Sequence, residues 1–191
     1  MIAREGLKAE IFSFARANKK DIDAVVDSDA DAVFLVVPSS EIHIRHKLGK
    51  KHEDILELAE DCIQYAKDHG LKVEFGAEDA TRSEEQFLKE LIRVSVNAGA
   101  DTVTPCDTVG VLTPEKAYAF YSDLAKSFPG VAFGVHCHDD FGMAVANSIA
   151  ALRAGAKEVH TTINGIGERA GNAALEEVVV ALELLLSLIH I

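Results

Sequence analysis

Two histidines separated by one residue give the sharpest chemical signal in the sequence. They lie in the segment 134–140, Gly-Val-His-Cys-His-Asp-Asp. Side chains alternate between the two faces of a strand, so His136 and His138 point the same way and Cys137 points toward the opposite face. Two imidazoles on one face can share a divalent metal ion, and two polar residues at a strand end are the plainer alternative. From spacing alone the two interpretations are equally supported, whereas His160, inside another strand pattern, is expected to be an interior histidine.

A second signal is the glycine-rich stretch 164–172, Asn-Gly-Ile-Gly-Glu-Arg-Ala-Gly-Asn. A glycine-rich turn between a strand and a helix lets backbone N–H groups approach an anion. A Walker A loop is excluded, because no Gly-Lys-Ser/Thr follows. A structural ion pair between Glu168 and Arg169 is the alternative, and spacing alone favours it over a functional role. Before this stretch, Asp139 and Asp140 either orient the imidazoles or cap the following helix, and capping is favoured for Asp140.

Two other predicted strand ends carry polar residues. Asp107 and Thr108 could bind a polar substrate, although satisfying the backbone groups of a turn is the favoured explanation. In the segment 74–82, Glu78 would reach the mouth of a barrel and Arg82 would clamp a carboxylate through two hydrogen bonds. The alternative there is a surface loop followed by a capping box that begins at Ser83.

These residues need elements to position them, and short apolar runs alternate with longer amphipathic stretches along the chain. The predicted strands are Glu10–Ala15, Ala32–Val37, Lys72–Ala77, Thr102–Cys106, Ala132–His138 and Glu158–Ile163. The predicted helices are Lys20–Asp27, Lys51–His69, Ser83–Ala98, Pro114–Phe128, Gly142–Ala154 and Ala174–Leu186. This alternation predicts a parallel sheet with helices outside it. Polar residues follow several strand ends and no glycine-rich fingerprint follows the first strand, so a barrel is favoured over a doubly wound sheet.

Composition narrows the class of protein further. The 191 residues carry a net charge of -12, which argues against a nucleic-acid partner because phosphate binding needs clustered Lys and Arg. No apolar run approaches the ~20 residues that span a bilayer. The three cysteines are odd in number and widely spaced. We therefore expect no disulfide framework, no membrane contact and a cytoplasmic location.

Taken together, the motifs resemble the group of 2-isopropylmalate, homocitrate and citramalate synthases. The resemblance runs from about Leu7 to Leu186, and the Gly-x-Gly-Glu-Arg-x-Gly-Asn pattern is its most specific part. The matching segments begin at Ser39 (Ser-Ser-Glu-Ile-His-Ile-Arg-His-Lys-Leu), Glu74 (Glu-Phe-Gly-Ala-Glu-Asp-Ala-Thr-Arg-Ser), Asp107 (Asp-Thr-Val-Gly), His136 (His-Cys-His-Asp-Asp-Phe-Gly-Met-Ala) and Asn164 (Asn-Gly-Ile-Gly-Glu-Arg-Ala-Gly-Asn). The resemblance implies a metal-dependent (β/α)₈ barrel.

By this resemblance the candidate site gains roles for individual residues. His136 and His138 become ligands of a divalent ion, which could be Zn²⁺, Mn²⁺ or Mg²⁺. Glu78 becomes the candidate catalytic residue. The residues expected to bind substrate are His43, Arg82, Thr108 and Asn164. The implied reaction joins acetyl-CoA, as co-substrate, to a 2-oxo acid by a Claisen-type condensation.

The resemblance also leaves choices open. The 2-oxo acid is expected to be 2-oxoisovalerate, as in leucine biosynthesis, with pyruvate and 2-oxoglutarate as near alternatives. A lyase of the same superfamily, such as a 3-hydroxy-3-methylglutaryl-CoA lyase or a hydroxy-oxo-acid aldolase, is the alternative enzyme. Such lyases use a Cys-containing glycine-rich loop, and 165–172 contains no Cys. A fragment that binds metal or 2-oxo acid without turnover is the third possibility.

The chain departs from the family at its ends. The acidic metal ligand of the family's first strand has no counterpart in Met1–Gly6. We therefore expect an incomplete barrel domain over 1–186, spanning about strands 2 to 7, and an unassigned tail at 187–191. The full-length parent is expected to be a homodimer. The fragment is expected to be inactive, and its open sheet edges are expected to cause poor stability or self-association.

Overall fold

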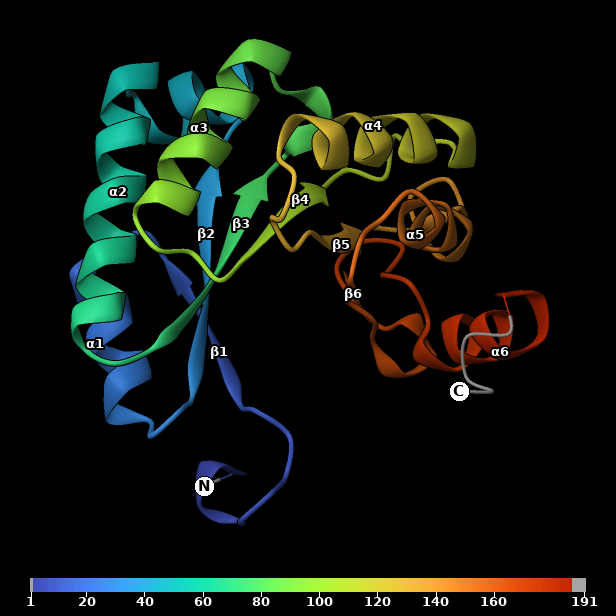
Figure 1. The fold of residues 1–191 in the computed structure, drawn as a ribbon, viewed down its shortest axis with the longest axis horizontal. Coiled ribbons are helices and arrows are strands. Elements are labelled where there is room, and N and C mark those ends of the chain that lie inside the picture. Colours follow the sequence, from blue (N-terminus) through green and yellow to red (C-terminus); the bar gives the residue numbers. More distant parts are fainter. Residues whose placement is uncertain (1, 187–191) are drawn as a thin grey trace. The chain divides into compact units, whose positions relative to one another are not determined.

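The structure, a computed structural model, describes residues 2–186, and the tail predicted at 187–191 lies outside them. Over the described range six strands alternate with six longer helices (Figure 1). The strands are β1 (Phe12–Arg16), β2 (Ala32–Pro38), β3 (Lys72–Glu78), β4 (Thr102–Asp107), β5 (Gly134–Cys137) and β6 (Glu158–Val159). The helices are α1 (Lys19–Asp27), α2 (His52–Asp68), α3 (Glu85–Asn97), α4 (Pro114–Ser127), α5 (Ala144–Arg153) and α6 (Leu175–Leu186). None of the helices in this range is long and apolar enough to span a bilayer.

The strand order distinguishes between the two architectures that the alternation allowed. The strands follow one another in chain order from β1 to β6. The pairs β1–β2, β2–β3, β4–β5 and β5–β6 are parallel. A doubly wound sheet reverses its strand order at a switch point, whereas a (β/α)₈ barrel adds each strand beside the previous one. The observed order is that of successive barrel units.

The chain divides into two compact units, residues 1–104 and 105–191. In the first unit, β1, β2 and β3 pair in register, with Ala32 of β2 opposite Lys72 of β3. Helices α1 and α2 contact these strands, and α3 contacts α2. Side chains of the strands that face the helices are completely buried, and they include Val33, Leu35 and Phe75. Burial of such side chains is worth about 1.5–3 kcal/mol each, which makes this helix–sheet layer the main core of the unit.

In the second unit, the last residues of β4 pair with β5, and β5 pairs with β6. Helix α4 packs against α5, and α5 contacts β5 and β6. The start of α4 follows the predicted signal, because the hydroxyl of Thr113 accepts a hydrogen bond from the backbone N–H of Lys116 and Pro114 is the first helical residue. In both units, therefore, helices alternate with the described strands and pack against the sheet, as the sequence pattern predicts.

Two local predictions were wrong. The strand predicted over Glu158–Ile163 ends at Val159, because Thr162 turns away to donate its backbone N–H to the carbonyl of Ala173. The capping box predicted at Ser83 is absent from α3, whose N-cap residue is Glu84 without a side-chain cap. The hydroxyl of Ser83 instead donates to the Ser39 hydroxyl at 2.8 Å, and so ties the β3 loop to the β2 loop.

Candidate functional site

The second unit brings three imidazoles together in a histidine cluster, defined as His136, His138 and His160. The Nε2 atoms of His136 and His138 lie 3.3 Å apart. On the other edge of the His136 ring, its Nδ1 lies 3.2 Å from Nδ1 of His160. The prediction that His136 and His138 share one face of β5 is confirmed. Cys137 is buried on the opposite face, so its predicted packing role is confirmed as well.

The register of the strands explains why these rings meet. In the parallel pair β5–β6, Gly134 lies beside Glu158 and Val135 beside Val159. The backbone N–H of His160 then donates to the carbonyl of Val135 at 2.9 Å, which continues the ladder by one residue. His136 and His160 therefore occupy adjacent positions on one face.

Burial keeps the central ring of the cluster uncharged. Desolvation by burial, with further contributions from the neighbouring His160 and His138, lowers the pKa of His136 to about 3. Its imidazole is therefore neutral at pH 7, which is the form that binds a metal ion. Burial likewise raises the pKa of the Cys137 thiol to about 12, so this sulfur is not a thiolate ligand.

The donor set fits a divalent ion. A zinc ion lies about 2.0–2.1 Å from a histidine nitrogen, and at that distance two nitrogens 3.3 Å apart subtend an angle near tetrahedral. Without an ion, a hydrogen bond between these atoms requires one Nε2 to carry the proton and the other to accept it, and a cation bound between them would take the place of that proton. The Nδ1 atom of His138 is buried without a hydrogen-bond partner among the described residues.

One further group near the histidine cluster was not predicted. Asn172 is buried, bridges to His138 through the backbone, and places its side-chain Nδ2 3.5 Å from Nε2 of His136. Because amide oxygen and nitrogen are assigned from their surroundings, either atom can face the ring. Asn164, the asparagine that was predicted to bind substrate, is exposed, and its backbone N–H donates to Glu176. The Gly-Asn that ends the glycine-rich stretch was the available signal for Asn172.

The glycine-rich loop is held by an ion pair between Arg169 and Asp140, and not by the predicted pair between Glu168 and Arg169. Arg169 donates to both carboxylate oxygens of Asp140 at 2.7 Å and to the carbonyl of Thr108 at 2.7 Å. Asp140 does not cap α5, whose N-cap residue is Met143 without a side-chain cap; the carboxylate of Asp139 accepts from the first helical N–H, that of Ala144, at 2.8 Å. The substrate-binding role predicted for Thr108 stays a prediction.

Asp107 satisfies the backbone groups of a turn, which was the favoured explanation from the sequence. Its buried carboxylate accepts hydrogen bonds from the backbone N–H groups of Val111 and Leu112 at 3.0 and 3.1 Å. Its carbonyl accepts from Gly110 and from His138. The residue thus closes the turn after β4 and anchors the end of β5, as a satisfied turn residue does.

The first unit contains a second group of candidate residues, the carboxylate cluster, which comprises His43, Lys47, Glu78, Asp79 and Arg82. Lys47 donates to both carboxylate oxygens of Glu78 at 2.8 Å. His43 Nδ1 lies 3.5 Å from the same carboxylate. Arg82 donates from Nε and Nη2 to the two oxygens of Asp79, at 2.8 and 2.7 Å.

Three predicted residues, His43, Glu78 and Arg82, are thus brought together, and two neighbours were missed. Lys47 reaches Glu78 because residues His43–Leu48 form a π-helix. Asp79 is fully buried and has a left-handed backbone (φ 62°), a conformation that a non-glycine residue keeps only under constraint. The two hydrogen bonds of Arg82 go to Asp79 of the chain itself, and the prediction that Arg82 clamps a substrate carboxylate stays a prediction.

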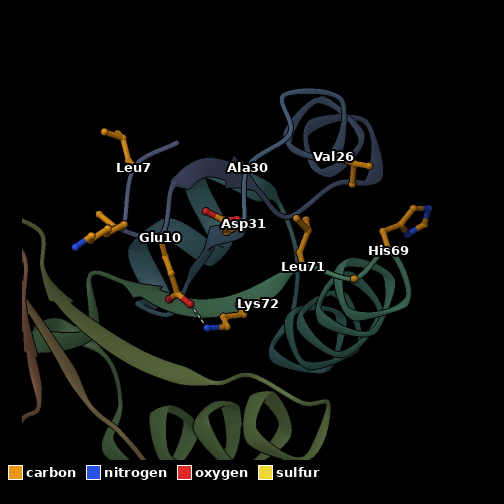
Figure 2. A pocket seen from close by; sticks show the side chains of 11 residues that line it. Leu7, Glu10, Val26, Ala30, Asp31, His69, Leu71 and Lys72 are labelled. Atoms are coloured by element: carbon orange, nitrogen blue, oxygen red, sulfur yellow. Dashed lines mark hydrogen bonds and ion pairs between the residues drawn. The ribbon is translucent and has the colours of Figure 1, made fainter. Parts of the chain in front are cut away.

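The first unit also has a pocket of about 530 Å³ that is not assigned to this site (Figure 2). Its walls come from the segments that precede β1, β2 and β3, and Figure 2 shows Glu10 and Lys72 pointing toward one another within it. It therefore lies at the amino ends of the strands. Active sites of α/β barrels are built at the carboxyl ends, where Glu78 and His138 are found.

Comparison with known proteins agrees with the fold and places the sequence in a family. The family model described as HMGL-like matches residues 1–190. The chain is 60% identical over 182 residues to a protein of Methanothermobacter thermautotrophicus named "Putative (R)-citramalate synthase", covering 95% of this chain and 36% of that protein. It is 51% identical over 186 residues to a probable 2-isopropylmalate synthase of Ignicoccus hospitalis, covering 97% and 47%. The chain thus spans less than half the length of these two relatives.

Among solved structures, the HMG-CoA lyase of Bacillus subtilis matches with a TM-score of 0.82 and 21% identity, over 95% of this chain and 66% of that one. This likeness concerns the fold, and it confirms the predicted α/β fold as part of a (β/α)₈ barrel. The family match over nearly the whole sequence, the barrel fold and the paired histidines at a strand end agree with one another, and the chain belongs to the HMGL-like family.

Proposed function

We propose that the protein containing this chain is a metal-dependent acyltransferase that condenses acetyl-CoA with a 2-oxo acid. The observation that carries the proposal is the pair of imidazoles at the carboxyl end of β5, whose Nε2 atoms lie 3.3 Å apart beside the amide of Asn172. The synthase names of the relatives support the choice of reaction over others that a metal barrel performs.

His136 and His138 would hold the ion, and Asn172 would supply a third group. Two imidazoles and an oxygen suit Zn²⁺ or Mn²⁺, and Mg²⁺ less well because it prefers oxygen ligands. A bound divalent ion supplies Lewis-acid polarisation of a keto carbonyl. Arg169 holds the loop that carries Asn172 by binding Asp140 and Thr108, and so positions the amide.

In the first unit we propose Glu78 as the catalytic carboxylate, with His43 and Arg82 as substrate-binding residues. Lys47 binds both oxygens of Glu78 and fixes its orientation. Asp79 does the same for the guanidinium of Arg82. Such fixed side chains lower the cost of ordering a substrate, because less motion is lost on binding. Thr108 and Asn164 remain proposed substrate-binding residues on their sequence resemblance.

The test is release of free CoA from acetyl-CoA with pyruvate, 2-oxoisovalerate or 2-oxoglutarate, in the presence of a divalent metal. It would be run on this chain and on a version extended by a family-like first strand and carboxyl-terminal region. We expect one 2-oxo acid to give thiol release with the extended version, and His136→Ala to abolish it. His69→Ala, which changes an exposed histidine, is the matched control.

The other outcomes are equally informative. We expect this chain alone to be inactive, and turnover by it would overturn that part of the proposal. If the folded, metal-loaded protein releases no thiol with any of the three 2-oxo acids, the proposed synthase activity is wrong. Cleavage of 3-hydroxy-3-methylglutaryl-CoA in its place would establish the lyase, and metal binding without either reaction would leave a non-catalytic binding role.

We further propose a cytoplasmic enzyme of amino-acid biosynthesis that forms a homodimer. Three buried free cysteines support a reducing compartment. The net charge of -12 supports a small-molecule substrate rather than nucleic acid. Light scattering measures the oligomeric state, and it also tests the predicted self-association of this chain.

A further inference from the structure

We propose that Glu158 and His160 act as a positioning relay that fixes the tautomer of His136, so that its proton sits on Nδ1 and its Nε2 is left for the metal ion. The inference rests on the metal site of the proposed function. It assigns a task to two residues that neither the sequence motifs nor the ligand set included.

The relay follows from which ring edges face each other. His136 presents Nε2 to His138 at 3.3 Å and Nδ1 to His160 at 3.2 Å. A hydrogen bond between the two Nδ1 atoms requires that one of them carries the proton and the other accepts it. If His160 carried it, His136 would hold its own proton on Nε2 and could not bind an ion there. The site therefore requires His136 to donate and His160 to accept.

Glu158 favours that arrangement. Its Oε1 lies 3.6 Å from Nε2 of His160. This distance is too long for a direct hydrogen bond, so the carboxylate acts through its charge and stabilises a proton on the nearer nitrogen. With the proton of His160 on Nε2, its Nδ1 is an acceptor for His136. Glu158 thus favours a proton on Nε2 of His160, and this in turn favours a proton on Nδ1 of His136.

The fold places all members of the relay by the two-residue repeat of a strand. Glu158 and His160 share a face, as His136 and His138 do, and the β5–β6 register, which puts Glu158 beside Gly134, sets His160 beside His136. Residues that orient ligating histidines typically change metal affinity 10–100-fold when mutated. The side chain of His160 is 23% exposed and that of Glu158 is 41% exposed. Solvent screens the carboxylate more, so we expect the effect of His160 to exceed that of Glu158.

The test is a competition titration of Zn²⁺ against a chromophoric chelator, with His160→Ala, His160→Asn and Glu158→Gln compared with the unmodified chain. We expect His160→Ala to weaken binding 10–100-fold. An asparagine oxygen occupies the place of a histidine Nδ1, so His160→Asn should recover most of the affinity. Glu158→Gln should lose less than about tenfold. His69→Ala is the control for removing a histidine outside the cluster.

A second measurement reports the tautomer directly and needs no variant. Long-range ¹⁵N–¹H correlation spectra of the metal-free chain should show His136 protonated on Nδ1, and His160→Ala should give a mixture of tautomers. Protonation of His136 on Nε2 in the unmodified chain would overturn the relay, as would wild-type affinity in His160→Ala. If His136→Ala also binds Zn²⁺ normally, the metal site itself is wrong, and the failure belongs to the proposed function.

Discussion

Two glycines of one loop should respond differently to substitution by alanine, one by a loss of stability and the other by a loss of metal affinity. A Cβ added at Gly167 would overlap the side-chain oxygen of Asn172, and a Cβ added at Gly171 would overlap the backbone oxygen of Gly165. Both contacts fall well inside the 3.0 Å that real Cβ atoms respect. The atoms that must give way differ, because one ends a side chain and the other belongs to the main chain.

At Gly171, an alanine side chain cannot be accommodated without backbone strain. The residue has φ +99°, which alanine adopts only with strain. The overlapped carbonyl also belongs to a residue whose oxygen accepts the N–H of Asn172. Adding about 1–2 kcal/mol of backbone strain to about 1–3 kcal/mol of overpacking gives a loss of about 2–5 kcal/mol in the free energy of unfolding.

At Gly167, alanine costs little stability but moves a proposed ligand. No left-handed φ is required there, so only the amide of Asn172 has to withdraw, by about 1 Å. Metal–ligand distances tolerate changes of about 0.2 Å, so the amide would leave the ion. We expect Zn²⁺ affinity to fall at least about tenfold, which is about 1.4 kcal/mol, with a loss of stability below about 1.5 kcal/mol.

The pair is measured by urea unfolding of the metal-free chain and by chelator competition for Zn²⁺. Gly171→Ala should lower stability whether or not metal is present, and Gly167→Ala should lower affinity with a smaller shift of the unfolding midpoint than Gly171→Ala gives. Gly130→Ala, at a glycine whose added Cβ meets nothing within 4 Å but whose φ is +91°, controls for backbone strain alone. A stable Gly171→Ala, or a Gly167→Ala that binds Zn²⁺ normally, would refute the reasoning.

Three other outcomes are expected. The pKa of His136 is about 3 in the folded chain and about 6.5 in the unfolded chain, so the metal-free chain loses stability as pH falls from 6.5 toward 3. In His136→Gln, the slope of the free energy of unfolding against pH, measured by urea unfolding, should be lower by up to about 1.36 kcal/mol per pH unit. Cys137, buried and with a pKa of about 12, should resist a thiol reagent at pH 8 until the chain unfolds, and stoichiometric labelling of native protein would contradict this. Arg82→Ala leaves the buried carboxylate of Asp79 without its bidentate partner and should cost about 3–5 kcal/mol in urea unfolding, whereas Arg82→Ala,Asp79→Ala should recover part of the loss.

The sequence was sufficient for the features that depend on local periodicity. All six helices and all six strands were predicted within a few residues, because the two-residue and 3.6-residue repeats are written into each segment. The facing of His136 and His138 follows from the same two-residue repeat. The polar strand ends identified the carboxyl edge of the sheet, where the candidate residues lie.

Features that depend on register and on unusual backbone were missed. His160 meets His136 only because β6 is aligned with β5, and no single segment encodes that alignment. Lys47 reaches Glu78 through a π-helix, which helical periodicity does not distinguish from an ordinary turn. Asn172 comes close to His136 because of how the intervening loop folds back, which the composition of the loop leaves open.

The glycine-rich stretch shows how a motif that looks chemical can serve a positional purpose. Its charged pair suggested either catalysis or a local ion pair, yet Arg169 reaches out of the loop to Asp140 and Thr108. Arg169 itself has a left-handed backbone (φ 58°), which turns its side chain away from its sequence neighbours. Since both ends of the loop are packed too tightly for a Cβ, the loop has one way to close, and that closure sets Asn172 beside His136. Its glycines and Arg169 therefore contribute to placing the amide of Asn172 beside the histidine cluster.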